Sequence, residues 1–140
     1  MKACIIAYIL VSTFVLLLSC GKGGVSSFEQ AEIALSEANI PELKKIITRD
    51  PKVVRQRRSY DQATLLHQAC SAGYHPVNEK IIRILVSNGA GVNVKDDLGR
   101  TPVHWIMYYG DNGEKLLPYF VKHGAEVQIT DVYGKKPEDY

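Results

Sequence analysis

Cysteine is scarce in this sequence, and charge of either sign is not in excess. Three cysteines are too few for the disulfide framework that stabilises many small secreted domains. The 17 Lys and Arg residues stand against 15 Asp and Glu residues, which leaves a formal charge of +2. This balance argues against a general nucleic-acid binder, and the 46% hydrophobic content argues against wholesale disorder. The 140 residues are enough for one compact domain.

The short motifs of familiar active sites are also missing. The sequence contains no GxSxG elbow, no Walker phosphate loop, no GxGxxG loop, and no HExxH or CxxC metal pattern. Asp96 and Asp97 are adjacent acids, but the twelve-residue ligand loop of a calcium site does not surround them. We therefore expect no catalytic residues, no metal ion, no cofactor and no small-molecule substrate.

One long hydrophobic run is present, and it lies near the amino end. Residues 3–18 carry no charge and follow Lys2. A helix needs about 20 apolar residues to cross a bilayer, so this run is short for a permanent anchor and favours a secretory signal. Two alternatives stay open, namely an ordinary signal peptide with an incidental cysteine and an uncleaved anchor.

The end of this run, Leu17-Leu18-Ser19-Cys20, resembles a bacterial lipobox. The resemblance implies that residues 1–19 form a lipoprotein signal peptide and that the sulfur of Cys20 receives lipid. Residues 20–27 are rich in Gly and Ser and are expected to form a flexible tether. Because Gly21, and not Asp, follows the cysteine, the resemblance implies the periplasmic side of a bacterial outer membrane.

The remainder of the chain contains an internal repeat. Residues 64–73 align with residues 101–110 at an offset of 37, and residues 81–90 align with residues 116–125 at an offset of 35. The first pair of segments shares a Thr and a His three residues apart, and the second pair shares a Gly after an apolar stretch. These shared residues are Thr64, His67, Thr101, His104, Gly89 and Gly124.

This pattern resembles the ankyrin repeat. The resemblance implies an all-α solenoid of stacked helix pairs with short β-hairpin or finger loops, over residues 28–140. The expected units are about 28–60, 61–97 and 98–132, followed by a partial unit over 133–140. The resemblance also implies that the Thr and His side chains form hydrogen bonds within and between repeats, which gives these residues a structural role. Pro118 either delays or kinks the helix that contains it.

The repeat pattern predicts a non-enzymatic module that binds a protein partner. Trp105, Tyr108 and Tyr109 are spaced to share one helix face, and Leu98 and Tyr133 lie at the expected tips of adjacent fingers. Trp and Tyr are common in binding hot spots, so these five residues form the candidate partner site. The alternative is that the rings cover the end of a short stack.

The identity of the partner is open at the level of sequence. By resemblance, it is either an envelope protein or a toxin, because small ankyrin lipoproteins can act as immunity proteins against type VI secretion effectors such as phospholipases. A separate alternative is an enzyme that uses the thiol of Cys70, which would require exposure and a lowered pKa. A basic cluster at Lys52, Arg55, Arg57 and Arg58 is either a patch for acidic partners or phospholipid headgroups, or a solvated loop.

Overall fold

A computed structural model of the chain describes residues 24–71, 77–109 and 113–140. The described residues form helices, turns and loops, and no β-strand occurs among them. The elements in chain order are α2 (Ser27–Ser36), α3 (Ile40–Arg49), η1 (Pro51–Arg55), α4 (Leu65–Ala69), α5 (Glu79–Ser87), α6 (Pro102–Tyr109), α7 (Gly113–Lys122) and η2 (Pro137–Asp139). The predicted all-α repeat fold is confirmed, with finger loops in place of β-hairpins.

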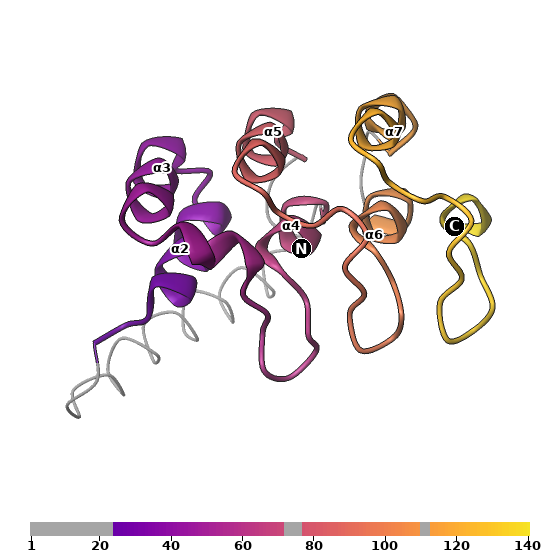
Figure 1. Ribbon diagram of the computed structural model, residues 1–140, viewed down its shortest axis with the longest axis horizontal. Coiled ribbons are helices and arrows are strands. Elements are labelled where there is room, and N and C mark those ends of the chain that lie inside the picture. The colour runs from indigo at the N-terminus through magenta and orange to yellow at the C-terminus, as the bar shows by residue number, and fades with distance from the viewer. Residues whose placement is uncertain (1–23, 72–76, 110–112) are drawn as a thin grey trace, which may run out of the picture.

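The helices form two rows along the length of the molecule (Figure 1). We call α2, α4, α6 and η2 the first-helix row and α3, α5 and α7 the second-helix row. Loops project from the first-helix row on the side away from the second-helix row (Figure 1). Each helix pair with its loop therefore stands beside the next pair as one unit of a solenoid.

These loops are the first finger (residues 58–63), the second finger (residues 96–100) and the third finger (residues 131–135). In the second finger the backbone N–H of Asp96 donates to the carbonyl of Arg100 over 2.9 Å, and in the third finger Asp131 and Lys135 pair in the same way. Neighbouring fingers are joined as well, because the N–H of Val132 donates to the carbonyl of Leu98 over 2.9 Å. The fingers are therefore ordered by backbone hydrogen bonds, although they contain no strand.

The hydrophobic core lies between the two rows of helices. In α5 the side chains of Ile81 and Leu85 are four residues apart and share a face, and in α7 Leu116 and Phe120 repeat this spacing. All four side chains are buried. Burial of one such side chain contributes about 1.5–3 kcal/mol to folding, so stacking of the pairs supplies most of the stability.

Pro118 lies inside α7, which begins at Gly113 and ends at Lys122. The sequence left open whether this helix starts late at the proline, and the structure shows that it does not. Proline lacks the N–H that would bond the carbonyl four residues earlier, which belongs to the exposed residue Glu114. Water can satisfy that carbonyl, so the helix tolerates the proline.

The basic cluster that follows α3 is largely engaged in holding neighbouring elements together. The Nε of Arg55 donates to the carbonyl of Gly89, and the Nη1 of Arg57 donates to the carbonyl of Lys95. Arg58 forms an ion pair with Asp61. Two of the four cations therefore join the first helix pair to the adjoining repeat, and a third is paired within the first finger. The cluster is thus not a patch of unpaired cations.

A glycine follows each of the helices α5 and α7, where the chain turns toward the next finger. Gly89 and Gly124 both have a φ of 87°, which is the left-handed region that residues with a Cβ avoid. The N–H of the residue after each glycine donates to a carbonyl of the preceding helix over 3.0 Å. Both helices therefore end in a left-handed turn that glycine adopts without strain.

Replacement of Gly124 by Ala should lower the free energy of unfolding by about 1–2 kcal/mol, which is the usual cost of a left-handed backbone for a residue with a Cβ. A Cβ at this position meets no described atom within 4 Å, so the loss should come from the backbone alone. Urea unfolding followed by circular dichroism measures the change. Gly24→Ala is the matched control, because its Cβ also meets open space but its φ does not require glycine. Equal losses in both variants would contradict the argument.

Candidate protein-binding surface

A buried threonine and histidine open the first helix of both central repeats. The backbone N–H of Thr64 donates to Nδ1 of His67 over 3.1 Å, and the two side chains lie 2.9 Å apart. Thr101 and His104 have the same distances, 3.1 Å and 2.9 Å. The Thr therefore connects the preceding finger to the helix. Nδ1 of the His accepts the backbone N–H of the Thr, which would otherwise have no hydrogen-bond partner at the start of the helix.

The second ring nitrogen of each histidine bonds to the next finger. Nε2 of His67 lies 3.0 Å from the carbonyl of Arg100, and Nε2 of His104 lies 3.2 Å from the carbonyl of Lys135. A carbonyl only accepts, so Nε2 carries the proton and Nδ1 accepts. Each imidazole is thus a neutral bridge between one repeat and the next.

Burial keeps both imidazoles neutral. Loss of solvation lowers the pKa of His67 to about 4, against an ordinary value of 6.5, although its bond to the carbonyl of Arg100 opposes the shift. The pKa of His104 is also lowered, again chiefly by burial. Neither histidine has a metal ligand set around it, since the described residues contain no group of three His, Cys, Asp or Glu that could hold a metal ion.

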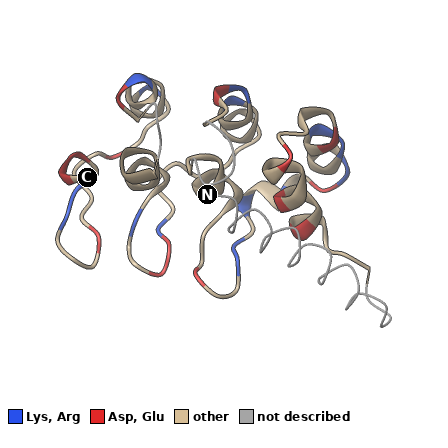
Figure 2. Ribbon diagram, turned by 180° about the vertical axis from the view of Figure 1, so that it is seen from behind, with Lys and Arg blue, Asp and Glu red and all other residues tan. Residues whose placement is uncertain are grey.

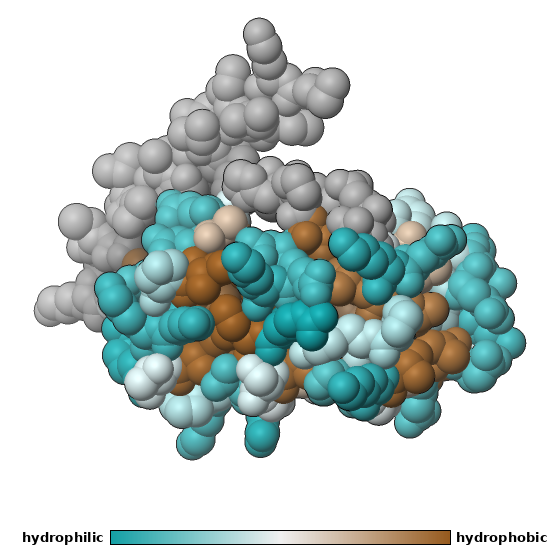
Figure 3. Space-filling view, turned by 90° about the horizontal axis from the view of Figure 1, so that it is seen from above, coloured by the Kyte–Doolittle hydropathy of each residue, from teal (hydrophilic) through white to brown (hydrophobic). Residues whose placement is uncertain are grey.

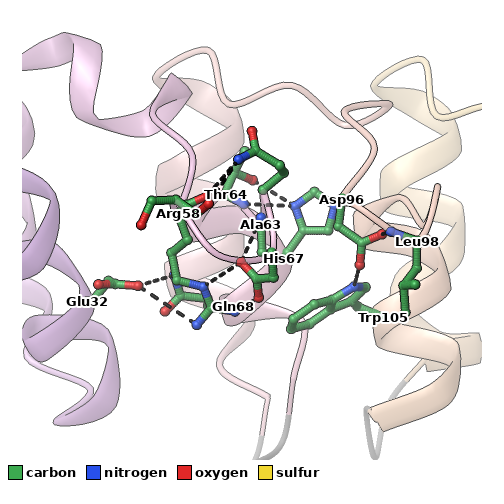
Figure 4. A network of polar contacts seen from close by, with 12 residues as sticks. Glu32, Arg58, Ala63, Thr64, His67, Gln68, Asp96, Leu98 and Trp105 are labelled. Atoms are coloured by element: carbon green, nitrogen blue, oxygen red, sulfur yellow. Dashed lines mark hydrogen bonds and ion pairs between the residues drawn. The ribbon is translucent and has the colours of Figure 1, made fainter.

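A buried aspartate organises the second finger and the helix that follows it. Oδ1 of Asp96 accepts the backbone N–H groups of Leu98 and Arg100 over 3.0 and 2.8 Å. Oδ2 of Asp96 accepts Nε of Arg100 over 3.0 Å and the indole Nε1 of Trp105 over 2.8 Å. Figure 4 shows Leu98 and Trp105 beside the same carboxylate, in the network that also holds His67.

The third finger repeats this arrangement. Oδ1 of Asp131 accepts the N–H groups of Tyr133 and Lys135, both over 2.9 Å, and Oδ2 accepts the hydroxyl of Tyr140. Although burial raises the pKa of Asp131, these hydrogen bonds bring it below its usual value. The hydrogen bond to Asp131 also raises the pKa of Tyr140 to about 12. Asp96 pairs with Trp105 as Asp131 pairs with Tyr140, with an offset of 35 residues in both members.

Trp105 therefore has a structural position, which corrects its assignment to the partner site. Its side chain is only 8% exposed, and its ring lies edge-on to His67 at 5.6 Å. The guanidinium of Arg100 lies 5.4 Å from the centre of the indole. A buried indole needs an acceptor for its N–H, and Asp96 supplies it. The side chain packs α6 against the second finger and has little surface left for a partner.

The tyrosines beside Trp105 do reach solvent. Tyr108 is 56% and Tyr109 is 41% exposed, and their ring centres lie 4.4 Å apart in an edge-to-face arrangement. Tyr108 also contacts the ring of Tyr140 at 5.1 Å. We call Tyr108, Tyr109 and Tyr140 the aromatic face. It confirms that residues 108 and 109 stand together on α6, and it adds Tyr140, which the sequence analysis did not name.

Leu98 and Tyr133 lie apart from this cluster on neighbouring fingers. Leu98 is partly buried beside Asp96, and Tyr133 is exposed. The backbone bond from Val132 to Leu98 holds the two fingers side by side. No described ring contact joins Tyr133 to Tyr108 or Tyr109, so the joint use of all five residues by one partner stays a prediction.

A second polar cluster, which the sequence analysis missed, joins the first repeat to the second. Nε2 of Gln68 donates to Oε1 of Glu32 over 2.7 Å, and Arg58 lies beside them (Figure 4). Arg58 forms ion pairs with both Glu32 and Asp61. Burial raises the pKa of Glu32. These residues come from α2, the first finger and α4, and no short sequence motif connects them. Only the fold brings them together.

Cys70 is fully buried at the end of α4. Burial raises the pKa of its thiol far above the usual range, so almost none of it is thiolate at neutral pH. A reactive cysteine needs exposure and a lowered pKa, and Cys70 has neither. The structure therefore gives no support to the enzymatic alternative.

Charges of both signs are mixed over the surface. Figure 2 shows Lys and Arg beside Asp and Glu on the fingers and in the second-helix row, without a broad area of one sign. No helix within residues 24–71, 77–109 and 113–140 is long and apolar enough to cross a membrane. The expected signal peptide at 1–19 and the expected lipidation site Cys20 lie outside the described residues.

The repeated helix pairs, the Thr–His bridges and the fingers have a direct counterpart among known families. A family model for ankyrin repeats in three copies matches residues 31–131. The chain belongs to the ankyrin-repeat family. Ankyrin repeats are a protein-interaction fold and are generally not enzymes, so this chain is a protein-binding module.

Similar proteins include a proteasome regulatory subunit of mammals. The human 26S proteasome non-ATPase regulatory subunit 10 is 38% identical over 81 residues, which are 58% of this chain and 33% of that protein. The mouse protein of the same name is also 38% identical over 81 residues and is covered to 32%. This ankyrin chain therefore spans about a third of the length of these relatives.

The neutral histidine bridges predict that the protein loses stability in mild acid. Between pH 6.5 and 4 the unfolded chain binds a proton at His67, whereas the folded chain does not. The contribution of His67 to the free energy of unfolding is therefore complete above pH 6.5 and declines as the pH falls toward 4. The free energy of unfolding should fall by up to about 1.4 kcal/mol per pH unit for this one group. Urea unfolding at several values between pH 7.5 and 5 measures the slope before most carboxyl groups titrate.

Two variants isolate the source of that slope. His67→Gln should be less stable at pH 7.5 but should have a weaker pH dependence, because the titrating group is gone. His123→Gln is the control for the loss of a histidine, because His123 is exposed and its described ring hydrogen bond stays within its own repeat. A slope that is unchanged in His67→Gln would assign the acid sensitivity to other groups.

Proposed function

We propose that the aromatic face is the surface through which this ankyrin module holds its protein partner. The observation that carries the proposal is the exposure of Tyr108 and Tyr109 on α6, directly beside a Trp105 that is buried and fixed. Tyrosines that already touch one another lose little conformational freedom on binding, and each offers a large apolar area with a polar hydroxyl. The surrounding charges are mixed, so the partner surface that fits is apolar with a polar rim.

The second and third fingers flank this face and extend the surface available to a partner. The ring of Tyr109 contacts the ring of Trp105, with 5.5 Å between the ring centres, and the guanidinium of Arg100 in the second finger lies 5.4 Å from the centre of the same indole. Tyr140 adjoins Lys135 of the third finger, whose Nζ lies 4.9 Å from the ring centre. The aromatic face is thus framed by a cation on either side, which favours hydrogen-bond acceptors at the edge of the partner.

The substitutions Tyr108→Ala and Tyr109→Ala should each weaken partner binding by at least about 2 kcal/mol, or roughly 30-fold, with little change in melting temperature. The full chain, purified with an affinity tag, is used to capture proteins from the cell envelope, and binding of the captured partner is then measured for each variant. Tyr119→Ala is the matched control, since Tyr119 belongs to α7 in the second-helix row. Affinity that falls with Tyr119→Ala and not with Tyr109→Ala would place the partner site elsewhere.

We propose further that the module is a lipoprotein attached through Cys20 to the periplasmic side of a bacterial outer membrane. The support is the sequence Leu17-Leu18-Ser19-Cys20 at the end of an uncharged run, followed by Gly21 and a Gly-rich tether. This location would limit the possible partners to two classes, an endogenous envelope protein or a toxin that acts in the same compartment, such as a type VI phospholipase effector. In the second case the module would act as an immunity lipoprotein.

Cys20→Ala should abolish lipid attachment and leave a precursor of the full 140 residues. The acyl chain is added to the sulfur of Cys20, so no other side chain of the tether can replace it. Metabolic labelling with a fatty acid and mass spectrometry of the purified chain measure the modification. Cys4→Ala is the control and should be labelled as the wild type is. Labelling that persists in Cys20→Ala would show that the lipobox interpretation is wrong.

A further inference from the structure

A shallow groove lies between α5 and α7 in the second-helix row. Its volume is about 420 Å³, and the residues that line it are Arg83, Ile84 and Ser87 of α5 and Tyr119, Lys122 and His123 of α7. The groove is separate from the aromatic face, because α5 and α7 belong to one row of helices and α6 belongs to the other (Figure 1). The Thr–His bridges and the finger aspartates involve none of these six residues.

Tyr119 is held between two other side chains of this groove. The guanidinium carbon of Arg83 lies 4.3 Å from the centre of the phenol ring, and the centre of the His123 imidazole lies 4.2 Å from it. Nδ1 of His123 also donates to the carbonyl of Tyr119 over 2.8 Å, which fixes the imidazole beside the ring. The ring of Tyr119 is therefore positioned before a ligand arrives, so that binding would cost little conformational entropy.

Three hydrogen-bond donors in the groove have no partner among the described residues. Nε and Nη2 of Arg83 bond to Oε1 of Glu79 over 2.8 and 2.6 Å, which leaves Nη1 of Arg83 without a described hydrogen bond. The Nζ of Lys122 and the hydroxyl of Tyr119 have no described partner either. Because one of these donors is a full positive charge and a second belongs to a guanidinium, they favour a ligand with negative charge and several acceptor oxygens. A phosphate group has both properties.

The repeat framework does not require these basic and aromatic residues in α7. At an offset of 35 residues, α7 carries larger or more basic side chains than α5 at three positions, namely Tyr119 in place of Ile84, Lys122 in place of Ser87 and His123 in place of Asn88. The helix α5 belongs to the same row and packs with an aliphatic side chain and two neutral polar ones at these positions. The three residues of α7 are therefore available for binding a ligand.

The second-helix row has an excess of positive charge. Its three helices contain seven Lys or Arg, all exposed, and three Glu, whereas the other described residues contain eight Lys or Arg and eleven Asp or Glu. One Glu stands in the first turn of each helix, so the excess is spread along the row and does not form one block. Figure 3 looks onto this row and shows hydrophobic residues between the hydrophilic ones. Excess cations, scattered apolar residues and a tyrosine suit the headgroup region of a membrane with anionic lipids.

We propose that the groove between α5 and α7 binds the phosphate of an anionic phospholipid headgroup, with Lys122 and Arg83 as its cations and the hydroxyl of Tyr119 as a further donor. The inference rests on the proposed attachment of the chain through Cys20. The tether from Cys20 to the start of α2 is about seven residues long and spans roughly 15 Å as a flexible coil, so the attached domain stays close to the headgroups. With the second-helix row on the membrane, the aromatic face of the first-helix row stays free for a protein partner.

A photoreactive amino acid at residue 87 of the full chain, reconstituted in phospholipid vesicles, tests this contact. In vesicles of equal parts of the two lipids it should cross-link to phosphatidylglycerol, which is anionic, in preference to phosphatidylcholine, which has no net charge. Lys122→Gln should lower the yield about fivefold, the usual effect of one cation at an anionic surface. Lys44→Gln is the matched control and should change the yield far less, because it removes the same charge from α3, which does not line the groove. Circular dichroism melting checks that each variant is folded.

The anchor and the groove give separate results in this experiment. Flotation with vesicles of phosphatidylcholine alone measures the attachment through Cys20. A chain that floats but gives no cross-link to phosphatidylglycerol would overturn the groove proposal and leave the lipoprotein proposal intact. Equal losses in Lys122→Gln and Lys44→Gln would overturn it as well, because the row would then attract lipid without a specific site. A cross-link to protein, or equal yields with both lipids together with binding of inorganic phosphate, would assign the groove to a different ligand.

Discussion

The neutral imidazole between repeats is the interaction on which the rest of the structure depends. His67 ties the start of its own helix, through Thr64, to the carbonyl of Arg100 in the next finger. A helix pair by itself cannot bury its apolar face, so the pairs must be held in register along the stack. The bridge does this only while the ring is neutral, because a protonated Nδ1 could no longer accept from the backbone. Burial maintains that state, and the same burial makes the register sensitive to acid.

The fingers depend in turn on a second buried group, the aspartate at 96 and again at 131. Each carboxylate fixes its finger through two backbone N–H groups and then accepts one aromatic donor from the helical segment that follows. The aromatic residues at 105 and 140 are thus part of the framework. Tyr108 and Tyr109 project beyond them, and their exposure is a consequence of the fixed position of Trp105. The framework and the proposed binding surface therefore share one cluster of aromatic rings, in which the buried Trp105 orients the exposed Tyr108 and Tyr109.

The sequence predicts the fold well because the repeat shows itself twice in the chain. Glycines at 89 and 124 recur at an offset of 35 residues and the Thr–His pairs at an offset of 37, and the structure gives each recurring set the same geometry. Trp105 was misplaced because residue type alone does not distinguish a hot spot from a buried ring with a satisfied N–H. A signal did exist, since Asp96 and Asp131 are separated by the same 35 residues as Trp105 and Tyr140. The contact of Glu32 with Gln68 spans 36 residues and has no such signal, because it arises only when the helices are packed.

The two rows of helices differ in which groups the third finger satisfies. Without the third finger, Nε2 of His104 would lose its acceptor at Lys135, and an unpaired buried donor costs about 1–3 kcal/mol. The third finger therefore completes the hydrogen bonding of the buried imidazole in α6. Among the described residues, α7 has no buried polar side chain, and the half-exposed Val121 forfeits only part of the free energy of burial. The two rows therefore differ in what they require, because the first-helix row needs a hydrogen-bond partner for each buried imidazole and the second-helix row needs only apolar contact.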